Sequence, residues 1–181
     1  MIPTLDGVHH LKLPVADLDR SAAWYADRLG YAIALEFRQR GRRTGVTMTH
    51  PRGGPDLGLV LDPDLARAAA GFDYFSIGVP DRAAITELAE DLTRRGEQHA
   101  GVHFATLGWI LPGLHDPDGH EVRFYTTESH TALDPANPLV VDDAIASARA
   151  AEQVWLSQRQ SAVEALRSAK NAATTTTSPI T

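Results

Sequence analysis

The length of 181 residues, the net charge of −6 and the absence of cysteine exclude several classes of protein. Disulfide frameworks and thiolate chemistry both need cysteine. A net negative chain lacks the basic footprint of non-specific nucleic-acid binding, and no stretch approaches the roughly 20 apolar residues that cross a bilayer. The first ten residues also lack the basic start and apolar run of a signal peptide, so we expect a cytoplasmic protein.

The first 62 residues predict a strand, a helix and three further strands. Alternating apolar residues predict a strand over 8–15, and a helix over 18–29 follows, with Asp17 as its N-cap and Gly30 just beyond its end. The remaining elements of this half are strands over 31–37, 44–50 and 57–61, a turn at 39–43, a Gly/Pro-rich loop at 51–55 and a helical turn over 65–70. Four arginines gather at the turn (Arg38, Arg40, Arg42 and Arg43); we interpret them as a solvated hairpin turn, with an anion site as the alternative.

The same pattern then starts again. We expect a strand over 74–79, a helix over 82–95 that ends before Gly96, and strands over 99–105, 109–114 and 121–126. The turn at 116–119, Asp-Pro-Asp-Gly, connects the last two strands, because proline pre-sets one backbone dihedral and glycine accepts a positive one. Residues 10–17 align with residues 74–81 at a constant offset of 64 (74 − 10), and the order of elements after each block is the same. The sequence therefore predicts a duplicated unit.

The character of the chain changes after Pro138. Residues 142–170 are rich in Ala, Glu, Gln and Arg without Gly or Pro, which predicts one long helix with a thin apolar stripe. Residues 172–181, with four consecutive threonines, are expected to form a disordered tail. We therefore divide the chain into a domain at 1–130, with modules at about 5–62 and 72–128, a mostly helical extension at 131–171, and the tail.

Two motifs at the ends of the duplicated unit carry a family resemblance. Residues 8–21, followed by Trp24-Tyr25 and by Leu29-Gly30-Tyr31, resemble the opening of vicinal oxygen chelate proteins, and residues 115–120 resemble their closing turn. This superfamily includes glyoxalase I, the extradiol dioxygenases and the fosfomycin and bleomycin resistance proteins. The resemblance covers about residues 5–128. It implies an α+β fold in which two tandem β-α-β-β-β modules form a curved mixed sheet around a cleft, here with an added C-terminal helix.

The resemblance also implies four metal-ligand positions, which this chain fills poorly. His10 matches the first position and has a suitable side chain. The second falls within 57–61, where no side chain can donate to a metal; the third falls on Tyr74, an uncommon ligand; and the fourth falls on Arg123, a permanent cation. We therefore expect no metal and no cofactor.

Strand alternation predicts which side chains face the cleft. Glu121, Arg123 and Tyr125 share one face of the last strand, and Lys12 lies on the same side of the first strand as His10. The candidate catalytic residues are His10, Glu121, Tyr74 and Arg123, and the candidate ligand-binding residues are Lys12, Phe37, His50, Ser76, Phe104, Trp109 and Tyr125. Two alternatives stay open: Arg123 either binds a ligand oxyanion or forms an ion pair with Glu121 or another acid, and the aromatic residues either line the cleft or belong to the core.

Two hypotheses of function follow. In the first, the protein binds a hydrophobic or aromatic small molecule with an anionic or oxygen-rich group, as in resistance or sequestration. In the second, it is a cofactor-independent isomerase, lyase or cyclase that acts on a natural-product-like substrate by acid–base catalysis. A metal-dependent dioxygenase or lyase is the third and weakest reading. Because members of the superfamily commonly pair so that clefts form near the subunit boundary, we also expect a homodimer.

Overall fold

The structure is a computed structural model that describes residues 5–142 and nine residues between 152 and 168. The nine residues are all helical, in agreement with the helix expected over 142–170: Glu152, Gln153, Leu156, Ser157, Gln160, Ser161, Glu164, Arg167 and Ser168. The rest of that predicted helix and the predicted tail at 172–181 lie outside the described residues.

The first module has the predicted order of elements and forms one four-stranded sheet. Its strands run in the order β1-β4-β3-β2, with β1 and β4 parallel and the other pairs antiparallel. The elements are β1 (His10–Val15), α1 (Leu18–Leu29), β2 (Ala32–Gln39), β3 (Arg42–Thr49), β4 (Asp56–Leu61) and α2 (Pro63–Ala69). Asp17 accepts hydrogen bonds from the backbone N–H groups of Asp19 and Arg20, and Gly30 closes α1 with φ 76°. Both ends of α1 are therefore where the sequence places them.

The second module repeats this topology, with strand order β5-β8-β7-β6. Its elements are β5 (Asp73–Val79), α3 (Arg82–Arg94), β6 (His103–Phe104), β7 (Trp109–His115) and β8 (Glu121–Thr126). The strand expected over 99–105 shortens to two residues. Gly101 has φ 85°, and the ladder between β7 and β8 shifts register between Leu111 and Leu114, so the pairing beside it is interrupted. The fold is thus α+β, with the two predicted β-α-β-β-β modules.

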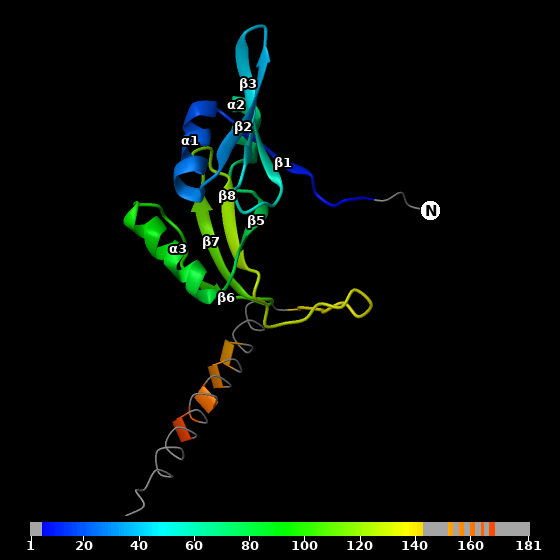
Figure 1. Cartoon of the computed structure of the whole chain (residues 1–181), viewed down its shortest axis with the longest axis vertical. Helices are drawn as coiled ribbons and strands as arrows, with labels where there is room; N and C mark the ends of the chain where they lie inside the picture. Colours follow the sequence, from blue (N-terminus) through cyan, green and yellow to red (C-terminus); the bar gives the residue numbers. More distant parts are fainter. Residues whose placement is uncertain are drawn as a thin grey trace, which may run out of the picture.

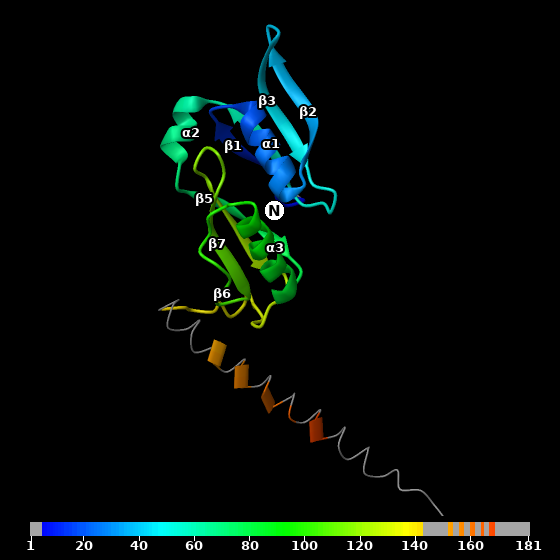
Figure 2. The ribbon, with the colours of Figure 1, turned by 90° about the vertical axis from the view of Figure 1, so that its left-hand side faces the viewer.

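The helices α1 and α3 lie on the same side of the molecule, which is the left side in Figure 1 and the near side in Figure 2. The side chains between helices and sheets form one hydrophobic core that runs through both modules. Its fully buried members include Leu13, Tyr25, Leu59, Leu92 and Leu111. Neither α1 nor α3 covers the opposite side of the sheets, and α2 packs against β1 of the first sheet. We call this opposite side of the first sheet the open face of sheet 1, made by His10, Lys12, Leu35, Phe37, Gly45, Thr47, Gly58 and Val60.

The turn at 116–120 joins the second module to α1 of the first. The Asp118 carboxylate accepts hydrogen bonds from the Ala16 backbone N–H at 2.9 Å, from Arg20 Nη2 at 2.8 Å and from Ser21 Oγ at 2.6 Å. Asp116 accepts from the Tyr25 hydroxyl at 2.9 Å. Because each of these bonds connects residues about 90 to 100 positions apart, the turn fixes the modules relative to one another.

Candidate functional site

The open face of sheet 1 brings three predicted site residues to one surface: His10, Lys12 and Phe37. In register, Lys12 lies beside Gly58, Gly58 beside Thr47, and Thr47 beside Leu35. A Cβ atom built on Gly58 would lie 3.4 Å from Cγ of Lys12, so the lysine stem runs along the glycine. His10 is exposed at the start of β1, where its Nδ1 is 3.0 Å from Nδ1 of His9.

Large apolar side chains stand exposed on this face beside two buried glycines, Gly45 and Gly58. Gly45 lies between Phe37 and Val60 in register, and a Cβ atom on Gly45 would come within 2.9 Å of the Leu59 carbonyl oxygen. The exposed fractions are 52% for Leu35, 51% for Phe37 and 39% for Val60. A contiguous apolar surface beside a lysine is typical of a binding surface. The sequence pointed to Lys12 and Phe37, but Leu35 and Val60 carried no signal beyond strand propensity.

The residues at the four implied metal positions do not fit a metal ion. Within the implied range 57–61, the residues of β4 on the open face are Gly58 and Val60, and neither has a donor atom; Asp56, which pairs with His10 in register, lies before this range. Arg123 is a cation, and the ring of Tyr74 packs edge-on against Phe72 and His120. Among the described residues, no group of three or more histidine, aspartate or glutamate side chains is placed to hold a metal. His10 therefore lacks the further ligands that a divalent metal ion would need among the described residues.

Arg123 is held between two carboxylates on the helix-free side of the second sheet. Its Nε lies 2.8 Å and its Nη2 lies 3.3 Å from the two carboxylate oxygens of Glu121, and its Nη1 lies 2.9 Å from Oδ2 of Asp73. Glu121 also accepts a hydrogen bond from the Gly113 backbone N–H at 3.0 Å. One cation between two anions leaves a net negative cluster. Of the two alternatives for Arg123, the structure therefore has the ion pair.

This pairing also decides the protonation of Glu121. The hydrogen bond from Arg123 lowers the pKa of Glu121, with smaller contributions from the Gly113 N–H and from the charge of Arg123. A carboxyl that holds its charge this firmly is a poor general acid at neutral pH. Its side chain is 15% exposed, so it is also poorly placed to receive a proton from a ligand.

Three other predicted residues, His50, Tyr74 and Ser76, line an open cavity of about 610 Å³ that we call the intermodule groove. One wall is the edge strand β5, and the other comes from the first module. Its lining also contains Tyr31 and Arg52, which the sequence did not single out. Tyr31 follows a helix and Arg52 lies in a glycine-rich loop, and neither position indicates from the sequence that the residue lines a cavity. None of the open-face residues lines this groove.

The last predicted aromatic residues separate into two environments. Phe104 and Trp109 are 8% and 6% exposed, lie edge-on at 5.1 Å and belong to the core on the helix-covered side of the second sheet. The Arg82 guanidinium lies 4.1 Å above the Trp109 ring. These two residues are therefore core side chains and not part of an accessible wall. Tyr125 lies on the other side of the sheet and lines a cavity of about 570 Å³ with the segment 133–141.

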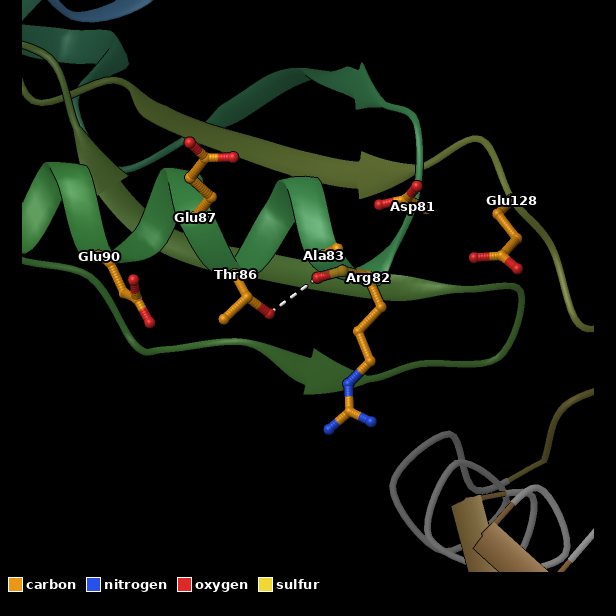
Figure 3. Close-up of a pocket in the computed structure, with 7 residues that line it drawn as sticks. All are labelled: Asp81, Arg82, Ala83, Thr86, Glu87, Glu90 and Glu128. Carbon is orange, nitrogen blue, oxygen red and sulfur yellow. Dashed lines mark hydrogen bonds between the residues drawn. The ribbon is translucent and has the colours of Figure 1, made fainter. Parts of the chain in front are cut away.

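A further surface cavity, of about 780 Å³, runs along the outside of α3 (Figure 3). Four of its seven lining residues are acidic (Asp81, Glu87, Glu90 and Glu128), and the others are Arg82, Ala83 and Thr86. In Figure 3 the only dashed line is the 2.8 Å hydrogen bond from the Thr86 hydroxyl to the Arg82 carbonyl, which is internal to the helix. None of the predicted site residues lines this cavity, and we assign it no role.

The arginine-rich turn of the first module has the two-residue geometry of a β-hairpin. Arg40 and Gly41 have φ values of 52° and 80°, as a type I′ turn requires. Two of the arginines are ion-paired, Arg38 with Glu36 and Arg43 with Glu36 and Asp19. Arg40 is exposed and has no side-chain partner among the described residues.

Comparison with known proteins agrees with this architecture. Several solved structures resemble this chain at 16–23% sequence identity, and at that identity the likeness shows the fold alone. They include a glyoxylase/bleomycin resistance protein/dioxygenase domain from Frankia sp. EAN1pec (23% identity, TM-score 0.55, 69% of this chain and 100% of that chain). They also include a lactoylglutathione lyase from Agrobacterium tumefaciens (20%, 0.55, 69% and 96%) and TnmS3, an antibiotic binding protein from Streptomyces sp. CB03234 (16%, 0.59, 70% and 100%).

The family assignment rests on the sequence itself. The profile of the Glyoxalase/Bleomycin resistance protein/Dioxygenase superfamily matches residues 7–124. This chain therefore belongs to that superfamily, as its two end motifs indicated. A search among curated proteins finds no significant match. Among the described residues, no helix combines the length and the apolar character needed to cross a membrane.

Proposed function

We propose that this protein binds a hydrophobic or aromatic small molecule with an anionic or oxygen-rich group, without a metal, on the open face of sheet 1. The observation that carries the proposal is the exposure of Leu35, Phe37 and Val60 around Gly45 and Gly58. Gly45 and Gly58 are themselves buried, so a flat ring would pack on the exposed side chains of Leu35, Phe37 and Val60 that surround them. Lys12 lies beside Gly58 and supplies a cation for the anionic group.

The ion pairs of Arg123 and the ionised Glu121 on the second sheet favour binding over acid–base catalysis. The catalytic alternative needs Glu121, His10 or Tyr74 to exchange a proton and Arg123 to stabilise developing negative charge. Arg123 is already paired with Glu121 and Asp73, and the lowered pKa of Glu121 keeps that carboxyl ionised. A protein of the same fold, TnmS3, is an antibiotic binding protein, which supports a binding function for this fold. Resistance or sequestration is the role we propose for this binding.

We further propose that a second copy of the chain closes the open face. In one chain the apolar side chains of this face are exposed to water, and covering them on dimerisation is favourable. The homodimer that the family resemblance implies supplies such a cover. Sedimentation velocity of the full chain tests this, and a monomer at all accessible concentrations would refute it. The cytoplasmic location stays a prediction.

Affinity measurements on matched variants test the binding face. A panel of aromatic carboxylic acids and aromatic antibiotics is screened by thermal shift, and the strongest ligand is titrated by calorimetry. A phenylalanine side chain offers about 200 Å². A ligand that covers the exposed half of Phe37 therefore removes about 100 Å² from water, which is worth about 2.5 kcal/mol, or roughly 70-fold in affinity as an upper limit. We expect Phe37→Ala to approach this loss and Lys12→Gln to weaken anionic ligands selectively.

The control is Leu65→Ala, which truncates an apolar side chain that is 53% exposed on α2 and is not one of the open-face residues. It should bind like the wild type. Wild-type affinity in both Phe37→Ala and Lys12→Gln would refute the open-face site. Stoichiometric iron, zinc, nickel or manganese in protein purified without chelators would refute the absence of a metal.

A further inference from the structure

The intermodule groove is a second cavity of ligand size, separate from the open face. Its volume of about 610 Å³ lies in the range of small-molecule sites. Every residue of β5 from Tyr74 to Val79 lines it, because β5 is the edge strand of its sheet and turns this edge toward the first module. The facing wall is largely apolar, with Val8, Leu11, Pro55 and Leu57. The groove can therefore cover the apolar body of a ligand from both sides.

Tyr31 places an unsatisfied hydroxyl group in this groove. The residue as a whole is only 9% exposed, and its hydroxyl has no hydrogen-bond partner among the described residues. This oxygen is not among the fully buried unpartnered atoms, so it is accessible from the groove and free to bond a ligand. Burial raises the pKa of Tyr31, and the charge of Asp56 raises it further, so the phenol stays protonated and can donate. Asp56 itself does not line the groove.

His50 offers a second donor beside Tyr31. The Nδ1 atom of His50 accepts a hydrogen bond from the Arg52 backbone N–H at 3.2 Å, so the proton of the neutral ring is on Nε2. The imidazole packs against the Tyr31 ring with centroids 5.1 Å apart. The Nε2–H has no partner among the described residues, and the ring is half-buried in the groove lining.

Arg52 adds a positive charge at the same end. Its guanidinium is exposed and has no partner among the residues that the structure describes. Gly53 and Gly54 follow it with φ values of 83° and 96° and with open space around them, so the loop brings no side chain that would cover the arginine. Two neutral donors and one cation, with no acidic residue in the lining, are complementary to an oxyanion.

We propose that the intermodule groove is a binding site for an amphipathic small molecule with a flat apolar body and a carboxylate, sulfonate or phosphate head. The head is held by Tyr31, His50 and Arg52, and the body lies between the edge of β5 and the apolar wall of the first module. This site does not depend on the function proposed for the open face, since the two share no residue.

The aromatic sulfonate 1-anilinonaphthalene-8-sulfonate is a suitable probe, because its fluorescence rises in apolar surroundings and its head is an oxyanion. We expect saturable binding to the full chain that Arg52→Glu weakens at least about tenfold, and that Tyr31→Phe weakens several-fold through loss of one charge-assisted hydrogen bond. The matched control is Arg40→Glu, which makes the same charge change at an exposed, unpaired arginine of the hairpin turn and should leave the affinity unchanged.

Two outcomes would overturn the proposal. Equal weakening by Arg52→Glu and Arg40→Glu would show a general effect of net charge. Complete loss of probe binding in Phe37→Ala, with wild-type binding in Tyr31→Phe, would place the probe on the open face alone. Conversely, binding that survives Phe37→Ala and is lost in Arg52→Glu supports the groove even if the open face binds nothing. Urea unfolding of each variant confirms that the compared proteins are folded.

Discussion

Replacing Asp118 by alanine removes a carboxylate that joins the two modules. The Asp118 side chain is 2% exposed and accepts three hydrogen bonds, from the Ala16 N–H, Arg20 and Ser21. Arg20 is 50% exposed and the Ala16 N–H lies at the surface, so water can solvate both after the change. Ser21 is fully buried, and its hydroxyl would lose its acceptor. Breaking a buried charged network of this kind costs about 3 kcal/mol.

Urea unfolding followed by circular dichroism measures this loss of free energy, and thermal unfolding measures the matching shift in melting temperature. For a chain of this size we expect Asp118→Ala to lower the melting temperature by roughly 6–12 °C. Asp118→Asn keeps the shape and one acceptor and should cost about half as much free energy. The control is Asp64→Ala, which removes an exposed carboxylate that pairs with Arg67 on the surface of α2 and should cause no measurable change. A loss below about 1 kcal/mol in Asp118→Ala would refute the assignment of the turn as the connection between modules.

Two further predictions concern pH. Burial, followed by the charge of Asp116, raises the pKa of Tyr25 well above its ordinary value of 10.0. Stability should therefore hold up to about pH 10 and fall above it, because there only the unfolded chain releases this proton. In urea titrations at pH 9 to 11, Tyr25→Phe should reduce this loss of stability, and an unchanged loss would contradict the assignment. The hydrogen bond from Arg123 lowers the pKa of Glu121 from 4.5. The contribution of ionised Glu121 to stability is therefore present above that pH and is lost as the pH falls below it. The difference in unfolding free energy between the wild type and Glu121→Gln should vanish between about pH 5 and 2, and a constant difference would count against the ion pair.

The local signals in the sequence determine most of the fold. Asp17 and Gly30 set both ends of α1, Gly41 with its positive φ permits the tight hairpin, and the Asp-Pro-Asp-Gly turn stands before β8 as predicted. The offset of 64 residues between the two halves indicated the duplication, and β1 and β5 occupy equivalent places in the two sheets. These features depend on residues close together in the chain, so backbone geometry and strand alternation are enough to predict them.

The site depended on contacts that no local pattern encodes. A shift in register between β5 and β8 after Asp73 puts that carboxylate on the same side as Arg123, where the two form an ion pair. Phe104 and Trp109 were candidates for a cleft wall until the packing of α3 placed them in the core. Tyr31 follows the end of α1 and His50 follows the end of β3, and the fold brings these two ends together so that the rings are in contact. The sequence by itself determined the elements, the duplication and the family. The tertiary structure decided which polar groups are paired and which side chains line a cavity, because burial and pairing depend on residues far apart in the chain.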